Sequence, residues 1–96
     1  MDFEKARNEF EDEEIWFDGG LGSSFDDAVI IRGTKNTVVG VKAEKHFIDQ
    51  RIYDWHFVKQ ELFTRNKKKY DVLTIGLSDG SFERIYFDIT DFFGKF

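Results

Sequence analysis

The side chains best suited to bind a metal ion lie between positions 44 and 56. Glu44, His46 and Asp49 are close together in the chain, and His56 follows soon after. Imidazole and carboxylate groups are common metal ligands. On a helix, however, positions 44 and 46 point in different directions, and only 46 and 49 share a face. No His-Glu-x-x-His or comparable spacing is present. We therefore expect no metal site and interpret both histidines as solvated.

The glycine-rich segment 18–24 is the clearest loop of the sequence and invites comparison with a phosphate-binding loop. Consecutive glycine amides can cradle an anion. The segment nevertheless lacks the lysine of a P-loop and does not match the G-x-G-x-x-G spacing. Asp18, Asp26 and Asp27 flank it and would repel a phosphate. We interpret it as an ordinary mobile connection between two strands.

Side chains for nucleophilic or acid–base catalysis are present without a recognisable arrangement. The serines all lie in predicted turns, where their hydroxyls commonly bond to the nearby backbone. With 19 acidic residues among 96, neighbouring carboxylates arise by chance, and nothing favours acid–base catalysis by Asp71, Glu83 or Asp88. The sequence therefore indicates no catalytic residue and no cofactor.

Charge is unevenly distributed along the chain, whose net charge is −5. Residues 1–18 hold eight acids and two bases, whereas residues 55–69 hold five bases and one acid. The acidic net charge argues against general nucleic-acid binding, because most non-specific affinity for nucleic acids comes from basic side chains that neutralise their phosphates. The run 65–69 is typical of a hairpin tip that lysines keep unpaired. The alternative is that it binds an acidic partner or a phosphate.

Aromatic residues make up 18% of the sequence and include 12 phenylalanines. Aromatics in excess of what a small core can hold lie on the surface, and surface aromatics are enriched at interfaces. Together with the basic run, they supply the candidate binding residues. These are Trp16, Phe47, Tyr53, Trp55, Arg65, Lys67, Lys68, Lys69, Tyr86, Phe92 and Phe96.

The chain has no cysteine, which excludes disulfides, thiolate zinc sites and cysteine nucleophiles. The acidic N-terminus is not a signal peptide, because it has neither a basic nor an apolar region of the required kind. No apolar run approaches the roughly 18 residues that a membrane-spanning helix needs. These features together predict a cytoplasmic protein without a membrane segment.

The first half of the chain predicts two helices and two short strands. Phe3, Ala6 and Phe10 form one stripe of a helix that ends near Glu13. Residues 15–17 and 28–32 read as strands. A second helix runs from Asn36 or Thr37 to about Tyr53. Its first apolar stripe comprises Val38, Val41, Ile48 and Ile52, and its second comprises Val39, Ala43 and Phe47. The rival interpretation makes 39–43 an alternating strand.

The second half predicts a meander of three strands. Residues 55–64, 70–77 and 82–89 are the strands, and a type I′ turn at Asp79-Gly80 joins the last two. Strict alternation then puts six apolar residues on one core face: Leu73, Ile75, Leu77, Ile85, Phe87 and Ile89. Residues 90–94 form a terminal helical turn. We expect at least one of the last three phenylalanines to lie near solvent.

These elements indicate a single α+β domain spanning residues 1–96. The sheet is expected to be mostly antiparallel, with the C-terminal three-stranded meander and two helices packed on one face. No internal repeat or linker divides the chain.

In general character the chain resembles the bacterial immunity proteins that neutralise toxins. It is small, acidic, aromatic-rich and cysteine-free, and it has no catalytic motif. This resemblance is one of composition and covers no motif, so it assigns no functional residue.

The sequence therefore predicts a non-enzymatic protein-interaction domain, of which an immunity or inhibitor protein docking on a basic partner is one form. The expected partner is another protein, nucleic acid is not expected, and a homodimer is compatible with the sequence. The alternative is a small-molecule-binding or enzymatic domain. Its pocket would lie between the sheet and the second helix, with walls from Tyr53, Trp55, Tyr70 and Tyr86.

Overall fold

One helix and five strands make up the part of the chain that the computed structural model describes, residues 15–34 and 36–94. In chain order they are β1 (Trp16–Gly19), β2 (Val29–Arg32), α2 (Thr37–Arg51), β3 (His56–Arg65), β4 (Lys68–Gly76) and β5 (Phe82–Asp88). The α+β class is confirmed. The helix predicted to end near Glu13 and the C-terminal Phe96 lie outside the described residues.

The strands form one sheet in the order β1-β2-β5-β4-β3. Three of its pairings are antiparallel, as predicted, but β2 and β5 pair in parallel. The sheet is therefore mixed: most of its pairings are antiparallel, as expected, and the parallel pair is the feature that the prediction did not include. Parallel neighbours require a long crossover connection, and here α2, β3 and β4 all lie between β2 and β5 in the chain.

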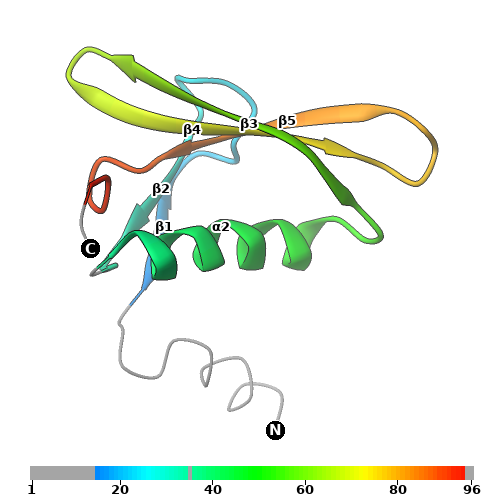
Figure 1. Ribbon diagram of the computed structural model, residues 1–96, viewed down its shortest axis with the longest axis horizontal. Helices are drawn as coiled ribbons and strands as arrows, with labels where there is room; N and C mark the ends of the chain where they lie inside the picture. The colour runs from blue at the N-terminus through cyan, green and yellow to red at the C-terminus, as the bar shows by residue number, and fades with distance from the viewer. Residues whose placement is uncertain (1–14, 35, 95–96) are drawn as a thin grey trace, which may run out of the picture.

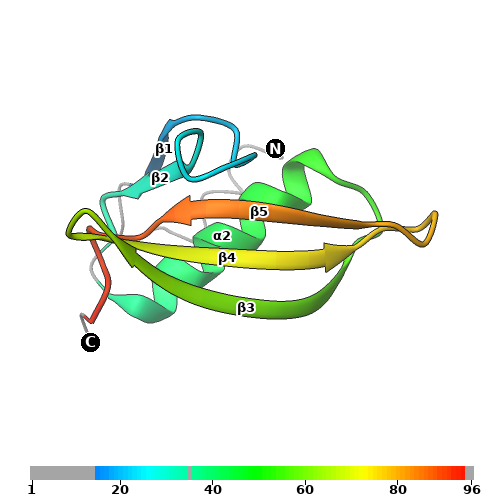
Figure 2. The same ribbon diagram turned by 90° about the horizontal axis from the view of Figure 1, so that it is seen from above.

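Helix α2 covers one face of this sheet and crosses it diagonally (Figures 1 and 2). The core lies between the two layers. Its sheet residues are Val29, Ile31, Leu73, Ile75, Ile85, Phe87 and Ile89, and Ala43, Phe47, Ile48 and Phe92 complete it. Five of the six residues of the predicted core face belong to this cluster, and the sixth, Leu77, packs against it. That prediction is confirmed.

The N-terminus of α2 is set by Asn36, whose side-chain oxygen accepts a hydrogen bond of 2.9 Å from the Val39 amide. The helical interpretation is thus confirmed, and the rival strand over 39–43 is wrong. The helix ends at Arg51, slightly before the predicted end.

The rotation of α2 differs from the prediction. Its buried residues are Gly40, Ala43, Glu44, Phe47 and Ile48, which follow the spacing of a single helical face. Val38 and Val41, assigned to an apolar stripe, are instead 66% and 47% exposed. The physical reason is the ring of Phe92: a Cβ atom on Gly40 would lie 2.4 Å from it. The position without a side chain therefore faces inward.

Two tight turns set the register of the meander, and the type I′ turn is not at Asp79-Gly80, where it was predicted, but in the β3–β4 connection. The β3–β4 turn has Asn66 and Lys67 at φ 51° and 67°, as in a type I′ turn. In the β4–β5 turn only Gly80 has positive φ, at 89°. There the Leu77 amide donates to Ser81 O and the Gly80 amide donates to Leu77 O. This three-residue loop replaces the predicted type I′ turn, yet it keeps the predicted register of Leu73 opposite Ile85.

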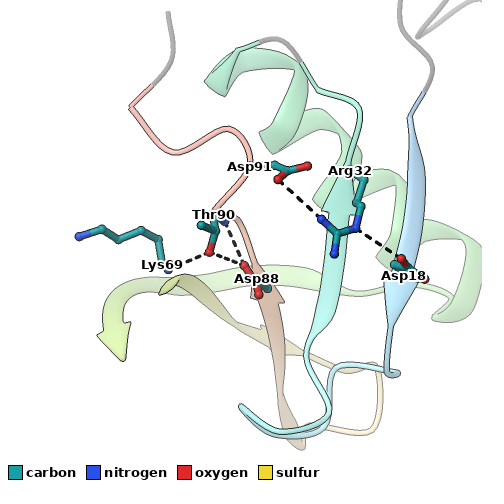
Figure 3. Close-up of polar contacts among 6 residues, drawn as sticks. All are labelled: Asp18, Arg32, Lys69, Asp88, Thr90 and Asp91. Atoms are coloured by element: carbon teal, nitrogen blue, oxygen red, sulfur yellow. Dashed lines mark hydrogen bonds and ion pairs between the residues drawn. The ribbon is translucent and has the colours of Figure 1, made fainter. Parts of the chain in front are cut away.

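Polar contacts hold the C-terminal turn against the sheet (Figure 3). The Thr90 hydroxyl donates to Asp88 Oδ1 at 2.6 Å and accepts from the Lys69 amide at 3.0 Å. From β2, Arg32 Nη1 lies 3.7 Å from Asp91 Oδ1. These contacts fix the turn that follows, in which Phe92 is buried and Phe93 is exposed. The exposure of Phe93 confirms the expectation that at least one of the last three phenylalanines lies near solvent.

Within the described residues, no helix has the length and apolar character needed to cross a membrane.

The Gly40→Ala variant should be less stable than the wild type, although alanine is the better helix former by about 1 kcal/mol. The new methyl group would overlap the buried Phe92 ring, and overpacking of this kind costs about 1–3 kcal/mol. Urea melts would measure the change. The control is Gln50→Ala, exposed on the same helix, which should change stability by less than about 0.5 kcal/mol. A stabilised Gly40→Ala would contradict the packing described.

Phe87→Ala should reduce the free energy of unfolding by about 3–5 kcal/mol, because it opens a cavity at a fully buried position. Lys68→Ala, at the exposed end of β4, should stay within about 0.5 kcal/mol of the wild type. Equal effects of the two substitutions in urea melts would show that the core face of the meander has been misassigned.

Candidate functional site

The predicted aromatic binding residues do not gather on one surface. Trp16 is exposed on β1, and Tyr53 is exposed after α2. Trp55 is partly buried against the core. Phe47 belongs to the core, where its ring lies 5.7 Å from that of Phe87. Their role in binding stays a prediction.

The basic run is divided between the two faces of the sheet. Arg65 stacks on the Phe25 ring, with its guanidinium carbon 4.3 Å from the ring centre. Lys69 points elsewhere: its Nζ donates to Thr64 Oγ1 at 2.9 Å and lies 5.0 Å from the Phe93 ring centre. Lys67 lies in the turn and Lys68 next to it, both exposed. Arg65 and Lys68 are paired across β3 and β4 and share the face of Phe25, whereas Lys69 lies on the other face.

An aromatic cluster covers the face of the sheet that α2 leaves open. The Phe25 ring centre lies 5.4, 5.1 and 4.9 Å from those of Phe63, Tyr70 and Tyr86. Phe25 belongs to the loop interpreted as a mobile connection, and Gly22 O of that loop accepts from the Tyr86 amide. Tyr70 and Tyr86 therefore lie on the opposite face from α2, so the four predicted pocket walls do not converge.

Several hollows lie beside α2, and two of them also adjoin strand β3. The larger, about 490 Å³, is at the C-terminal end of the helix and is lined in part by Tyr53, Trp55 and Asp49. Both carboxylate oxygens of Asp49 are already bonded, one to Lys45 Nζ at 2.9 Å and one to Trp55 Nε1 at 2.8 Å. The Lys45 bond, with a smaller contribution from Trp55, lowers the pKa of Asp49. The acidic side chain in this hollow, Asp49, therefore already has a hydrogen-bond partner on each oxygen.

The smaller hollow, which we call the α2–β3 pocket, has a volume of about 250 Å³. It lies between the start of α2, strands β3 and β4, and the C-terminal turn. Its walls are mainly apolar, and its polar side chains are Thr37 of α2, Gln60 of β3 and Asp71 of β4. Residues that line it include Val41, Gln60, Leu62, Asp71, Phe92 and Phe93.

A buried pair of carboxyl groups adjoins this pocket. Asp71, which lines the pocket, and Glu44 on the inner face of α2 are each only 1% exposed. Gln60 Nε2 donates to Asp71 Oδ2 at 2.9 Å. Asp71 Oδ1 and Glu44 Oε2 are buried and lack a hydrogen-bond partner. Burial, followed by hydrogen bonding to Asp71 and the charge of Asp71, raises the pKa of Glu44 well above its ordinary value.

Glu44 therefore keeps a proton that it can donate to the adjacent Asp71 carboxyl group. Among the described residues, no lysine, arginine or histidine forms an ion pair with either acid.

Sequence reasoning missed this pair, although both positions carry a signal. Asp71 is in phase with Leu73 and Ile75, so alternation alone puts it on the core face. Glu44 lies four residues after Gly40 and four before Ile48, on the face that proves to be buried. Charged residues are almost never fully buried unless paired, so neither acid alone gives a reason to expect burial.

Comparison with protein-family models, curated protein sequences and solved structures finds no match for this chain.

Glu44→Gln should remove a pH dependence of stability. The folded wild type keeps a proton on Glu44 that the unfolded chain releases above its ordinary pKa of 4.5. Stability therefore falls as pH rises from there to the folded-state pKa, by up to about 1.4 kcal/mol per pH unit. Glutamine cannot ionise, and its amide can still donate to Asp71. The variant should thus gain stability relative to the wild type as pH rises.

Urea melts between about pH 5 and pH 8 would measure this difference. Glu83→Gln, an exposed substitution on β5, is the control and should keep the wild-type slope. A constant difference between Glu44→Gln and the wild type over this range would contradict the protonated state assigned to the pair.

Proposed function

We propose that the protein is a non-enzymatic interaction domain that uses strand β3 to dock on an extended segment of a basic partner protein. One observation carries the proposal. Among the described strands β3 is one edge of the sheet, and its Phe57 and Leu62 side chains are 57% and 59% exposed. The unpaired backbone groups of an edge strand can add a strand from another chain, and apolar side chains beside them supply affinity.

The surface around this edge supports the proposal. Val58 of β3, Val41 of α2 and Phe93 of the C-terminal turn are also exposed large hydrophobic residues. Val41 and Phe93 line the α2–β3 pocket together with Leu62. Exposed apolar residues that are contiguous, rather than scattered, mark interaction sites.

The geometry of β3 limits where a partner strand could pair. A β-bulge interrupts the register between Phe57 and Lys59, and bulges discourage pairing at an edge. From Lys59 to Arg65 the pairing with β4 is regular. Glu61 on this stretch forms ion pairs: its Oε1 lies 3.8 Å from Lys59 Nζ and 3.4 Å from Arg84 Nη2. A partner segment would therefore pair with residues 59–65.

Charge favours a basic partner over a second copy of this chain. The net charge of the chain is −5, so at long range two copies repel each other and a basic protein is attracted, although residues 55–69 around the edge are themselves basic. The buried carboxyl pair also lies beside the same edge, through Asp71 and its contact with Gln60 of β3. An inhibitor or immunity-type protein that caps a basic toxin is one concrete form of this function.

A second candidate is a small-ligand-binding domain, and the carboxyl pair is the observation that favours it. Titratable pairs with shifted pKa values beside a concave apolar site are candidates for functional sites. The α2–β3 pocket, at about 250 Å³, is below the roughly 300–1,000 Å³ of pockets for drug-sized ligands. It would accept only a small molecule.

The first proposal is tested by a matched pair of substitutions, Leu62→Gln and Leu21→Gln. Both leucines are exposed, so neither change should cost more than about 0.5 kcal/mol of stability. Leu62 lies on β3 and Leu21 in the β1–β2 loop. Affinity capture from native lysate should recover a stoichiometric basic protein with the wild type and Leu21→Gln. Leu62→Gln should lose most of it.

Amide hydrogen exchange of the complex would locate the contact, and protection should appear at residues 59–65. Recovery of the same partner by both variants, or no stoichiometric partner at all, would refute the proposal. So would a dimer of the purified chain with residues 59–65 protected, because the occupant of the edge would then be a second copy.

A further inference from the structure

The α2–β3 pocket opens beside the strand edge to which docking is assigned above. Its walls include Val41 of α2, Leu62 of β3 and Phe93 of the C-terminal turn, which are between 43% and 59% exposed. Side chains that line a hollow and also reach solvent form its mouth. In Figure 2 the start of α2 extends past β3, so a strand added to this edge would lie over the pocket.

The pairing of β3 determines which side chains of an added strand face the pocket. Leu62 pairs with Asp71, which is buried on the α2 side of the sheet. Phe63, the next residue, contacts Phe25 on the opposite face. Residues directly opposite each other in a ladder point to the same face, and their neighbours point to the other. A partner residue paired with Leu62 would therefore point toward the pocket.

The chemistry of the walls suits an apolar occupant. Gln60 Nε2 donates to Asp71 Oδ2 at 2.9 Å, and Asp71 is only 1% exposed, so these two polar side chains are bonded to each other. Most of the remaining wall is apolar and includes the side chains of Phe92 and Phe93. The volume is about 250 Å³, and an apolar cavity of about 150 Å³ already accepts benzene. One large apolar side chain therefore fits.

We infer that a segment docked on β3 inserts one large apolar side chain, from the residue paired with Leu62, into the α2–β3 pocket. Phenylalanine suits the pocket, because aromatic rings pack favourably edge to face against Phe92 and Phe93. In this mode of recognition the backbone of the added strand supplies affinity, and pockets for alternate side chains supply specificity. The inference rests on the proposed docking function and names the residue that the partner segment must carry.

Two substitutions of the same residue type separate the pocket from the strand edge. Val41 and Val38 are both exposed on α2, at 47% and 66%, and Val41 lines the pocket whereas Val38 does not. Neither belongs to β3, so Val41→Gln and Val38→Gln leave the backbone of the edge unchanged. Val41→Gln should weaken occupation of the pocket about tenfold, because the occupant would bury an amide group. Val38→Gln should have no effect.

The first probe is toluene, which is the side chain of phenylalanine alone. Toluene should give saturable NMR shifts at the methyl groups of Val41 and Leu62 in the wild type. Propionamide, the side chain of glutamine alone, should give none. The shifts at Leu62 should need about tenfold more toluene in Val41→Gln and the wild-type concentration in Val38→Gln.

The second probe is a short extended peptide of alternating lysine and threonine with phenylalanine at its centre, compared with the same peptide containing glutamine there. The phenylalanine peptide should bind at least about tenfold more tightly, the factor expected for burying such a side chain. Amide hydrogen exchange should show protection of residues 59–65. The preference for phenylalanine should shrink in Val41→Gln and persist in Val38→Gln.

Equal binding of the two peptides, equal behaviour of Val41→Gln and Val38→Gln, or absence of toluene shifts at Leu62 would overturn the inference. If Leu62→Gln still loses the captured partner in such a case, the docking function stands and only the pocket assignment falls. Toluene binding without protection of residues 59–65 by either peptide, and without a captured partner, would instead overturn the docking function and the inference with it.

Discussion

The packing of Phe92 on Gly40 fixes the rotation of α2, and most of the molecule's surface chemistry depends on that rotation. Because the ring occupies the space of the missing side chain, the face that includes Glu44 and Phe47 turns toward the sheet. The same rotation turns Val38 and Val41 toward solvent. One contact between distant segments therefore produces both the buried acid and the exposed apolar surface.

Features set by neighbouring residues could be predicted from the sequence. The alternation of Leu73 and Ile75 predicted their core face, and the capping side chain of Asn36 predicted the start of the helix. The limits of strands β2, β4 and β5 followed from similar local patterns. Each depends on interactions within a few residues or across one tight turn, which is the range over which sequence patterns are informative.

Features set by long-range contacts could not be predicted. The parallel pairing of β2 with β5 joins Val29 to Phe87, and nothing local to either strand specifies it. The carboxyl pair brings Glu44 of the helix to Asp71 of β4, and each acid alone resembles a solvated residue. The hairpin turns were also not predictable from local sequence alone. The type I′ turn predicted at Asp79-Gly80 is found instead at Asn66-Lys67.

The central place of β5 has a consequence for how the chain is made. Two antiparallel pairs, β1–β2 and β3–β4, can form as soon as each has been synthesised, but β5 is the strand that joins them. Until β5 leaves the ribosome, the nascent chain holds two separate ribbons whose inner edges are open and whose apolar side chains lack their main partner, Phe87. Such late, non-local pairing slows folding and exposes strand edges to other chains. The strand order itself therefore makes β5 the last element needed to complete the sheet.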